Sequence, residues 1–250
     1  EGMTLVLTLY SVWNAYSPSV VKVELSSRKL TAPLRFAQIT DVHIGSRSAG
    51  FLERVMQQVD SLDIDFLCIT GDFIDAPNIG LDKLAPLRDC RVPIYFSIGN
   101  HERYEDLDDI LQRLATLGVQ VLRSRSIVHG PVQVIGIDDS GHPAQVKRQL
   151  PSIAIDPRLF VLLLYHRPHG LADAAQEGVD LMISGHTHNG QIVPFNLVVA
   201  KVFEQVVGLF RHGDTQLYVS PGTGTWGPVM RLGSRGEVTY FEIKPLATAY

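Results

Sequence analysis

The sequence predicts an α/β fold in which buried strands alternate with helices that cover the sheet. Continuous apolar runs of strand length, such as residues 65–70 and 160–165, indicate strands that are buried on both faces. Between such runs, apolar residues recur at helical spacing, for example Leu52, Val55 and Met56. The composition agrees with this class, because 250 residues with 45% hydrophobic and 19% charged side chains exclude a disordered or fibrous protein.

The first half of the chain alternates regularly between the two kinds of element. Strands are expected at residues 35–40, 65–70 and 93–98, and helices at residues 52–62, 81–87 and 107–117. The second half is richer in strands, which we expect at residues 132–137, 160–165, 181–184, 216–220 and 237–243. No Pro-, Gly- or Ser-rich linker divides the chain. Residues 1–250 are therefore interpreted as one domain, with residues 1–30 forming an apolar lead-in and a first strand.

Charge and cysteine content exclude two further classes of protein. The formal net charge is −4 and no cluster of Lys and Arg stands out, so no nucleic-acid partner is expected. Two cysteines, Cys68 and Cys90, are too few for a disulfide scaffold. Cys68 lies in an apolar run and is expected to be a small buried side chain.

The most apolar stretch, residues 3–13, lies almost at the start of the sequence. It has about half of the roughly 20 residues that a spanning helix needs, so no segment is expected to cross a bilayer. It also lacks the basic start and the small-residue cleavage site of a signal peptide. Two interpretations remain open: a first strand or helix packed on the core, or the end of a longer hydrophobic segment.

Polar side chains follow five of the expected strands. Asp41, Asp72, Asn100, His166 and His186 each come directly after an apolar run, or within about two residues of its end. In α/β sheets, functional groups gather beyond the carboxyl ends of the strands, on loops that a rigid base positions. We therefore expect these five side chains to meet at one edge of the fold.

These residues belong to short motifs that can bind metal ions. The motifs are Asp41-x-His43, Gly71-Asp72-x-x-Asp75, Gly99-Asn100-His101-Glu102, the single His166, and Gly185-His186-x-His188. Any one of them has a structural interpretation, such as an Asx turn or a hydrogen-bonded loop histidine. Together, two carboxylates, one amide and four imidazoles form a ligand inventory for two divalent ions. Mixed oxygen and nitrogen ligands without a thiolate suit Mn, Fe, Zn or Ni better than Ca or Mg.

The five motifs, complete and in this order, resemble the five blocks of the calcineurin-like metallophosphoesterase superfamily. They extend from about residue 35 to residue 190. The segment Gly190-Gln191-Ile192 and the tail at 221–232 are similar to bacterial predicted phosphohydrolases that have hydrophobic N-termini. The resemblance implies a four-layer αββα sandwich, in which two facing mixed β-sheets are flanked by helices.

The resemblance also implies how the motifs divide the metal ions. One ion would be bound by Asp41, His43 and His188, and the other by Asn100, His166 and His186. Asp72 would bridge the two ions.

Two further residues would serve the chemistry. The resemblance implies that His101 is not a ligand but acts beside the leaving group, as a general acid or an electrostatic stabiliser. Asp75 would orient His101 and keep it protonated, since a carboxylate neighbour raises the pKa of a histidine. The nucleophile would be a hydroxide that bridges the metal ions. His169, three residues after His166, is a weaker candidate for a supporting position. Arg167 is interpreted as a solvated side chain, with contact to a substrate phosphate as the alternative.

The sequence thus predicts a binuclear metallophosphoesterase that hydrolyses a phosphate ester or anhydride. Its expected cofactors are two divalent ions (Mn, Fe, Zn or Ni), with manganese expected to serve best in vitro. An alternative substrate is a nucleotide-linked lipid pyrophosphate. The alternative from another class is a non-catalytic scaffold with this fold, but such a scaffold should have lost ligands or His101, and all of these are present.

A second apolar segment, residues 195–210, follows the last motif. Its apolar residues cover more than one helical stripe, whereas a solvated surface helix normally keeps a wider polar face. The segment is either a helix buried against the sheet or an apolar lip that contacts lipid or an acyl chain. Together with residues 3–13, the lip interpretation predicts that the protein associates with a membrane surface, without indicating which side of the membrane. The expected substrate is a small-molecule or lipid phosphate. A cytoplasmic location is the alternative, and no oligomeric state is indicated.

Overall fold

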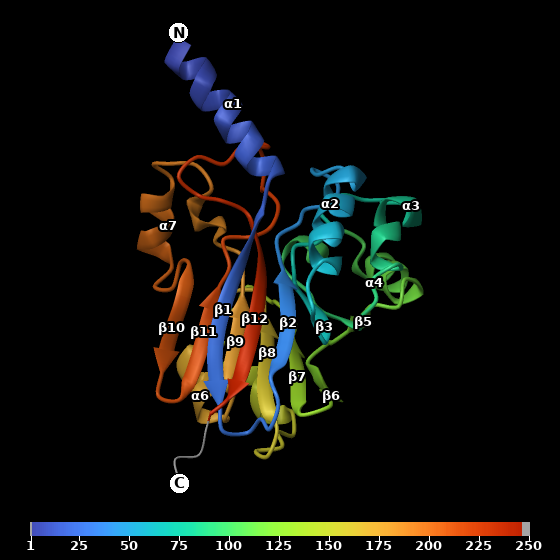
Figure 1. The fold of residues 1–250 in the computed structure, drawn as a ribbon, viewed down its shortest axis with the longest axis vertical. Helices are drawn as coiled ribbons and strands as arrows, with labels where there is room; N and C mark the ends of the chain where they lie inside the picture. Colours follow the sequence, from blue (N-terminus) through green and yellow to red (C-terminus); the bar gives the residue numbers. More distant parts are fainter. Residues whose placement is uncertain (1, 247–250) are drawn as a thin grey trace.

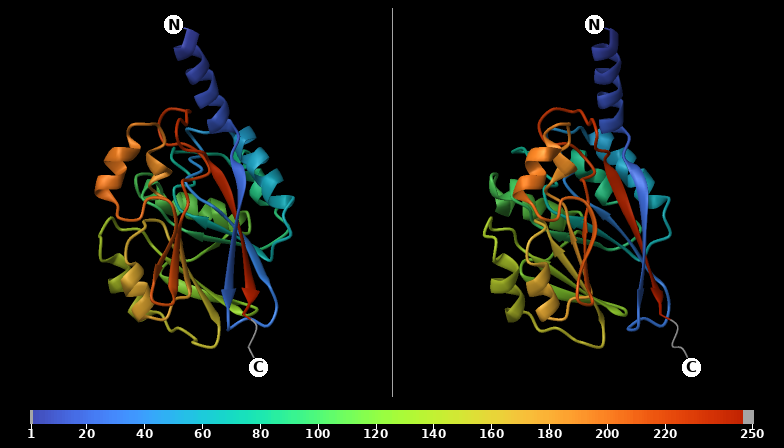
Figure 2. Two further views of the ribbon diagram at one scale, coloured as in Figure 1. Left: turned by 60° about the vertical axis from the view of Figure 1, so that its left-hand side comes forward. Right: turned by 90° about the vertical axis from the view of Figure 1, so that its left-hand side faces the viewer.

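Two six-stranded sheets lie face to face in the computed structural model, which describes residues 2–246 (Figure 1). Helices cover the outer faces of both sheets (Figure 2). Each sheet contains parallel and antiparallel pairs of strands. The predicted α/β fold of two mixed sheets flanked by helices is therefore confirmed.

The first sheet has four parallel strands and, at one edge, two strands that run in the opposite direction. Its order is β1 (Ser19–Ser27), β12 (Glu237–Pro245), β2 (Leu34–Ile39), β3 (Phe66–Thr70), β4 (Ile94–Ser97) and β5 (Gln120–Val121). Strands β2 to β5 are parallel, whereas β12 runs antiparallel to β2 and parallel to β1. The first and last strands of the chain, β1 and β12, are therefore neighbours in this sheet.

The second sheet has antiparallel strands at both edges. Its order is β10 (Gly208–His212), β11 (Thr215–Val219), β9 (Leu181–Ser184), β8 (Phe160–Tyr165), β7 (Val132–Ile137) and β6 (Arg125–His129). The four inner strands are parallel, and all of the side chains of β7, β8 and β9 are buried. Burial on both faces explains why these strands are continuous apolar runs in the sequence.

Three apolar layers hold the sandwich together. Between the sheets, the ring of Phe36 stacks on Phe66 and Phe241, with centroids 5.0 and 4.7 Å apart. Outside the first sheet lie α2 (Ala49–Asp60), α3 (Leu81–Leu84) with η1 (Ala85–Leu87), and α4 (Leu107–Thr116). Outside the second sheet lie α5 (Gln145–Gln149) with η3 (Leu150–Ser152), and α6 (Leu171–Gln176).

The N-terminal helix differs from the expectation that residues 3–13 pack on the core. Helix α1 (Gly2–Tyr16) extends away from the sheets (Figure 1), and only Ser11, Asn14 and Ala15 are buried. Its exposed apolar side chains include Met3 and Trp13, at 78% and 57% exposure. The interpretation as a core element is therefore wrong for most of this segment. Within residues 2–246, no helix has both the length and the apolar character required to cross a membrane.

The second apolar segment also differs from its expected form. The helix α7 (Asn196–Val202) occupies less than half of residues 195–210, and β10 forms the last part. In α7 only Val199 is buried, so the helix is not covered by the sheet. The sequence pattern does not predict strands β5, β6 and β10, because their side chains are only partly buried or exposed.

Candidate active site

The predicted ligands do meet at one edge of the sandwich. Asp41, Asp72 and Asn100 follow β2, β3 and β4 of the first sheet, whereas His166 and His186 follow β8 and β9 of the second. Each sheet thus presents the carboxyl ends of parallel strands to the same place, where their loops face each other. The structure brings all seven predicted metal-ligating residues together there, in two groups.

The first group contains Asp41, His43 and His188. One donor atom of each lies within 4.8 Å of the other two, and all three residues are buried. The Nε2 atoms of His43 and His188 are 3.2 Å apart, and Oδ1 of Asp41 is 3.3 Å from Nε2 of His188. This group corresponds to the first set of ligands that the sequence predicts.

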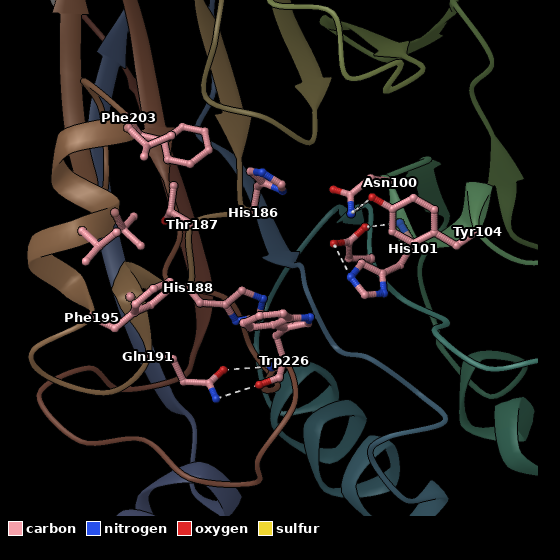
Figure 3. A pocket seen from close by; sticks show the side chains of 15 residues that line it. Asn100, His101, Tyr104, His186, Thr187, His188, Gln191, Phe195, Phe203 and Trp226 are labelled. Carbon is pink, nitrogen blue, oxygen red and sulfur yellow. Dashed lines mark hydrogen bonds and ion pairs between the residues drawn. The ribbon is translucent and has the colours of Figure 1, made fainter.

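The second group contains Asp72, His166 and His186. Oδ2 of Asp72 lies 3.1 Å from Nε2 of His166, which in turn lies 3.1 Å from Nδ1 of His186. Asn100 lines the same pocket as Asp72 and His186 (Figure 3). Its Oδ1 atom is buried and has no hydrogen-bond partner among residues 2–246.

This arrangement fits divalent metal ions. A buried amide oxygen without a hydrogen-bond partner is costly. A bound metal cation would satisfy the oxygen of Asn100, which is a neutral ligand and adds no negative charge to the site. The facing imidazole nitrogens, 3.2 Å apart in the first group and 3.1 Å apart in the second, can share a proton or can both bind a cation. Both groups therefore have the donor set that Mn, Fe or Zn ions accept from proteins.

The carboxylates of the site are ionised without any metal. Burial opposes the ionisation of Asp41, but His188, His166 and His43 together hold the pKa of Asp41 well below its usual range. Burial likewise would lower the pKa of His166, yet Asp72 and Asp41 beside it raise this pKa to about 10. A metal ion would replace the proton on such a histidine, so metal binding is expected to release protons.

The ligand loops are held in an unfavourable backbone conformation. Five ligands lie in the left-handed region, with φ of 54° at Asp41, 57° at His43, 49° at Asp72, 73° at His186 and 50° at His188. Each such residue costs about 1–3 kcal/mol, and strain of this kind persists where the surrounding structure fixes a functional site.

Two glycines make room for the carboxylates. A Cβ at Gly99 would collide with Oδ1 of Asp72, and a Cβ at Gly185 would collide with Oδ2 of Asp41. The Gly of the Gly-Asn and Gly-His motifs is therefore required by the close approach of a ligand.

Glu102 is a residue whose importance the sequence did not reveal. It is fully buried and accepts hydrogen bonds from the backbone N–H groups of Asp72, Phe73, Ile74 and Gly99, at 2.6 to 3.1 Å. Glu102 thereby joins the loop that carries Asp72 to the loop that carries Asn100. Glu102 belongs to the motif Gly99-Asn100-His101-Glu102, but the sequence pattern does not show the backbone groups that it binds.

His101 and Asp75 are arranged differently from the expectation. Oδ2 of Asp75 lies 3.2 Å from Nδ1 of His43, and Asp75 also accepts hydrogen bonds from Ser46. Asp75 therefore orients a predicted metal ligand rather than His101, which is the arrangement expected of a carboxylate behind a metal-bound histidine. His101 donates its backbone N–H to Oδ1 of Asp72 at 2.9 Å. Burial lowers the pKa of His101, and Asp72 and Asp75 offset this only in part, so His101 is not held protonated.

Arg231 is a second residue that the motifs did not single out for a role. Its guanidinium is completely buried behind the first group, where it donates to the carbonyl oxygens of Pro221 and Gly224, both at 2.7 Å. It also donates to Oγ of Ser234, which donates in turn to the carbonyl oxygen of His188 at 3.1 Å. Arg231 thus fixes the loop behind His188.

Arg231 also connects the site to α1. Its backbone N–H donates to the carbonyl oxygen of Ser11, and its carbonyl oxygen accepts from Nδ2 of Asn14. The base of α1 is therefore attached to the segment that supports His188.

A cavity of about 440 Å³ opens above the two groups (Figure 3). Its polar side includes Asp72, Asn100, His101, His186 and His188. Figure 3 shows Phe195 and Phe203 across the cavity from Tyr104 and His101, with Trp226 near His188. Arg167 does not line the cavity, because it is paired with Asp139 at 2.7 Å, although its Nη1 is 3.1 Å from Nε2 of His186.

Comparisons with known proteins agree with this arrangement. Residues 34–190 match the model of the calcineurin-like phosphoesterase family. The chain is 33% identical, over 97% of its length, to a protein of Danio rerio called "transmembrane protein with metallophosphoesterase domain". It is 32% identical, over 91% of its length, to an uncharacterized metallophosphoesterase of Helicobacter pylori. The chain spans 61% and 64% of the length of these two relatives.

Among solved structures, the phosphopantetheinyl hydrolase of Mycobacterium tuberculosis is similar with a TM-score of 0.48 and 12% identity. The likeness covers 80% of this chain and 92% of that one.

Proposed function

The chain belongs to the calcineurin-like phosphoesterase family, and we propose that it hydrolyses a phosphate ester or anhydride with two divalent metal ions. The observation that supports this most directly is that Asp41, His43 and His188 form one group, and Asp72, His166 and His186 another, with the donor atoms of each group within 4.8 Å of one another. Manganese is the ion we expect to serve best, because imidazole-rich sites favour borderline ions over Mg²⁺.

The ligands divide between the ions according to their positions. Asp41, His43 and His188 would hold one ion, and His166, His186 and the free oxygen of Asn100 would hold the other. Asp72 would lie between them, since its Oδ2 faces His166 while its Oδ1 faces the backbone of His101. When bound, the ions would supply the positive charge that stabilises the phosphoryl oxygens and activates a water molecule.

Two further residues would support the reaction: Asp75 would orient the ligand His43, and His101 would interact with the leaving group of the substrate. Oδ2 of Asp75 faces Nδ1 of His43 at 3.2 Å, so this carboxylate would favour a proton on Nδ1 and leave Nε2 free to bind a metal ion. His101 lines the cavity with a side chain that is 19% exposed, so it can reach a substrate. Because burial lowers its pKa, His101 would act as a general acid only when the anionic substrate beside it raises that pKa; as a neutral imidazole it would donate a hydrogen bond to the departing oxygen. The scaffold alternative gains no support from this geometry, because all seven predicted ligands are present and Asp72, Asn100, His186, His188 and His101 line the cavity.

The test combines metal analysis with hydrolysis of bis-p-nitrophenyl phosphate. Exhaustive chelation is expected to abolish hydrolysis, and Mn²⁺ is expected to restore it at least as well as Mg²⁺. Elemental analysis should then give two ions per chain. Full activity in protein shown to be metal-free would refute the proposal, and stoichiometric metal without hydrolysis would favour the scaffold.

We also propose a membrane surface as the partner of the end that carries α1. Residues 2–16 contain no charged side chain, and Leu5, Val6 and Leu9 are 61–64% exposed. Near the base of the helix, the guanidinium of Arg235 lies 5.9 Å from the ring centre of Trp13. Aromatic rings next to cations are typical of side chains at the level of lipid headgroups. The name of the Danio rerio relative, which calls that protein a transmembrane protein, agrees with this proposal.

A further inference from the structure

The cavity above the ligand groups has two chemically different walls (Figure 3). One wall and the floor carry the ligands, His101 and Tyr104. The other wall is apolar and comes from α7 and its two flanking residues: Phe195, Val198, Val199, Val202 and Phe203. A ligand whose phosphate lies at the metal groups therefore meets this apolar wall directly.

The apolar wall is exposed rather than covered by the protein. Val198 and Val202 are 50% and 67% exposed, and Phe195 is 49% exposed. Contiguous exposed apolar side chains on a soluble surface mark a binding surface. Because this surface continues into the cavity, an apolar part of the ligand can leave water by lying along it.

The position of α7 is fixed by the loop that carries the ligands His186 and His188. A Cβ at Gly190 would collide with the backbone of Asn196, so the loop and the first turn of α7 are in direct contact. The hydroxyl of Thr187 donates to the carbonyl oxygen of Val206 at 2.6 Å, which ties the segment after α7 to the same loop. Phe203 packs edge-to-face on His186, with ring centres 5.3 Å apart. The wall and the metal groups therefore form one binding surface.

Trp226 lines the cavity with a side chain that is 52% exposed. Oε1 of Gln191 accepts the backbone N–H of Trp226 at 2.8 Å, and Nε2 of Gln191 donates to the carbonyl oxygen of Trp226 at 2.8 Å. This pair of bonds is visible in Figure 3 and fixes the backbone on which the half-exposed indole is carried. A large apolar ring held by a buried amide is suited to cover an apolar ligand.

The side chains around the cavity indicate how many phosphate groups a ligand can carry. None of the residues that line it, all of them in the described part of the chain, is a lysine or an arginine. The nearby Arg167 is neutralised by Asp139. A second phosphate beyond the metal groups would therefore find no cation to pair with, which argues against a nucleotide-linked pyrophosphate.

We infer that the site takes an amphiphilic phosphate ester, with a single phosphate at the metal groups and an apolar chain along α7 beneath Trp226. This inference rests on the proposed phosphoester hydrolysis and names its class of substrate. In the reaction the oxygen of water bonds to phosphorus, the P–O bond to one alcohol breaks, and that alcohol leaves with a proton. The apolar chain contributes binding to the wall and takes no part in the bond changes.

The experiment compares p-nitrophenyl methyl phosphate with p-nitrophenyl octyl phosphate, both kept below the concentration at which micelles form. The leaving group is the same, so a difference reports the apolar chain. We expect kcat/KM to rise roughly 10–100-fold from the methyl to the octyl ester, since each methylene buried on a protein is worth up to about fourfold. Val198→Asn with Val202→Asn should reduce the octyl-to-methyl ratio by about fivefold or more. Val128→Asn, which changes a similarly exposed valine on β6, should leave the ratio unchanged.

A binding measurement makes the result independent of turnover. In a Trp13→Phe background, fluorescence of the remaining Trp226 should respond to octyl phosphate at a concentration at least tenfold lower than to methyl phosphate. Equal kcat/KM for the two esters, or equal binding of the two phosphates, would overturn the inference while leaving hydrolysis intact. Loss of hydrolysis for both esters with tighter octyl phosphate binding would instead refute the proposed function and keep the apolar site.

Discussion

At the scale of single residues, metal binding and proton transfer are expected to be separable. Asp72→Ala should lose or weaken both ions, because Asp72 is the carboxylate that we propose bridges them. His101→Ala should keep both ions while turnover falls by roughly 10²–10⁴, the usual contribution of a positioned acid. The loss should be smaller for esters with good leaving groups, which need less protonation. Elemental analysis alongside steady-state kinetics checks this, and a metal site emptied by His101→Ala would show that His101 is a ligand.

Glu102 provides a prediction about the support of the ligand loops. In Glu102→Gln, one oxygen that accepts backbone N–H groups becomes an NH₂ group that faces them. The unmade hydrogen bonds should reduce the free energy of unfolding by about 2–3 kcal/mol and weaken metal binding. Thermal unfolding with and without Mn²⁺ measures both effects. Glu53→Gln, on the exposed surface of α2, is the matched control, and equal melting temperatures for the two variants would contradict the assigned role.

Arg231 is expected to act on one metal ion more than on the other. Arg231→Lys keeps the charge but loses the planar fork that binds the carbonyl oxygens of Pro221 and Gly224. The loop behind His188 should loosen, so that titration with Mn²⁺ shows one weakened site of about tenfold lower affinity and one unchanged site. Arg235→Lys, four residues further and exposed, should leave both affinities as they are. Equal weakening of both sites would mean that Arg231 supports the fold in general.

At the scale of elements, the strands around the site could be predicted because they are buried on both faces. The expected strands at 132–137, 160–165 and 181–184 coincide with β7, β8 and β9. The elements within residues 195–210 could not be predicted from the sequence. Continuous apolar character does not distinguish a short helix followed by a strand from one longer helix.

The site itself was predictable to the extent that its residues sit at strand ends. The seven ligands converge because strand order and direction are set by patterns that the sequence shows. The pairing of Asp75 with His43, and the buried roles of Glu102 and Arg231, depend on loop conformations for which no periodicity exists. Left-handed φ at Asp41 or His188 is likewise invisible in a sequence, since neither residue type demands it.

Hydrolysis is expected to survive the removal of α1, provided that the shortened chain keeps β1 complete. A chain that starts at Lys22 would lose the pairs that Ser19, Val20 and Val21 make with β12. A chain that starts at Ser17 keeps β1 whole, so it should hydrolyse bis-p-nitrophenyl phosphate within about threefold of the full chain. It should melt at a higher temperature than the shorter form, which circular dichroism can measure. Loss of hydrolysis in the Ser17 form would show that the contacts of Ser11 and Asn14 with Arg231 are needed for the site.

At the scale of the whole molecule, the apolar features lie at one end. Figures 1 and 2 show α1 and α7 at the end of the sandwich opposite the C-terminus. The loop with Trp226 borders the same cavity as α7. A bilayer that contacts α1 would therefore lie near the mouth of the cavity, where an amphiphilic ester could enter without crossing water.

This geometry predicts binding to lipid vesicles and identifies the residues responsible. Phe203 and Phe210 are partly buried, and Phe203 packs on His169 and His186, so they are poor places to test the surface. Leu9 on α1 and Leu197 on α7 are 61% and 63% exposed and can be changed without opening the core. Leu9→Glu with Leu197→Glu should reduce the fraction of protein that co-sediments with vesicles by about tenfold.

Two comparisons decide whether the surface meets a membrane. Arg54 and Arg235 lie beside the aromatic rings of α1, so anionic vesicles should bind more protein than zwitterionic ones, and salt should weaken the difference. Val128→Glu, which places the same charge at a 58% exposed position on β6, should sediment like the unchanged protein and bind the same number of metal ions. If the unchanged protein sediments with neither kind of vesicle, the exposed apolar side chains of α1 and α7 do not contact lipid. The octyl ester would then be recognised from solution, because that recognition requires only the wall formed by α7 and Trp226.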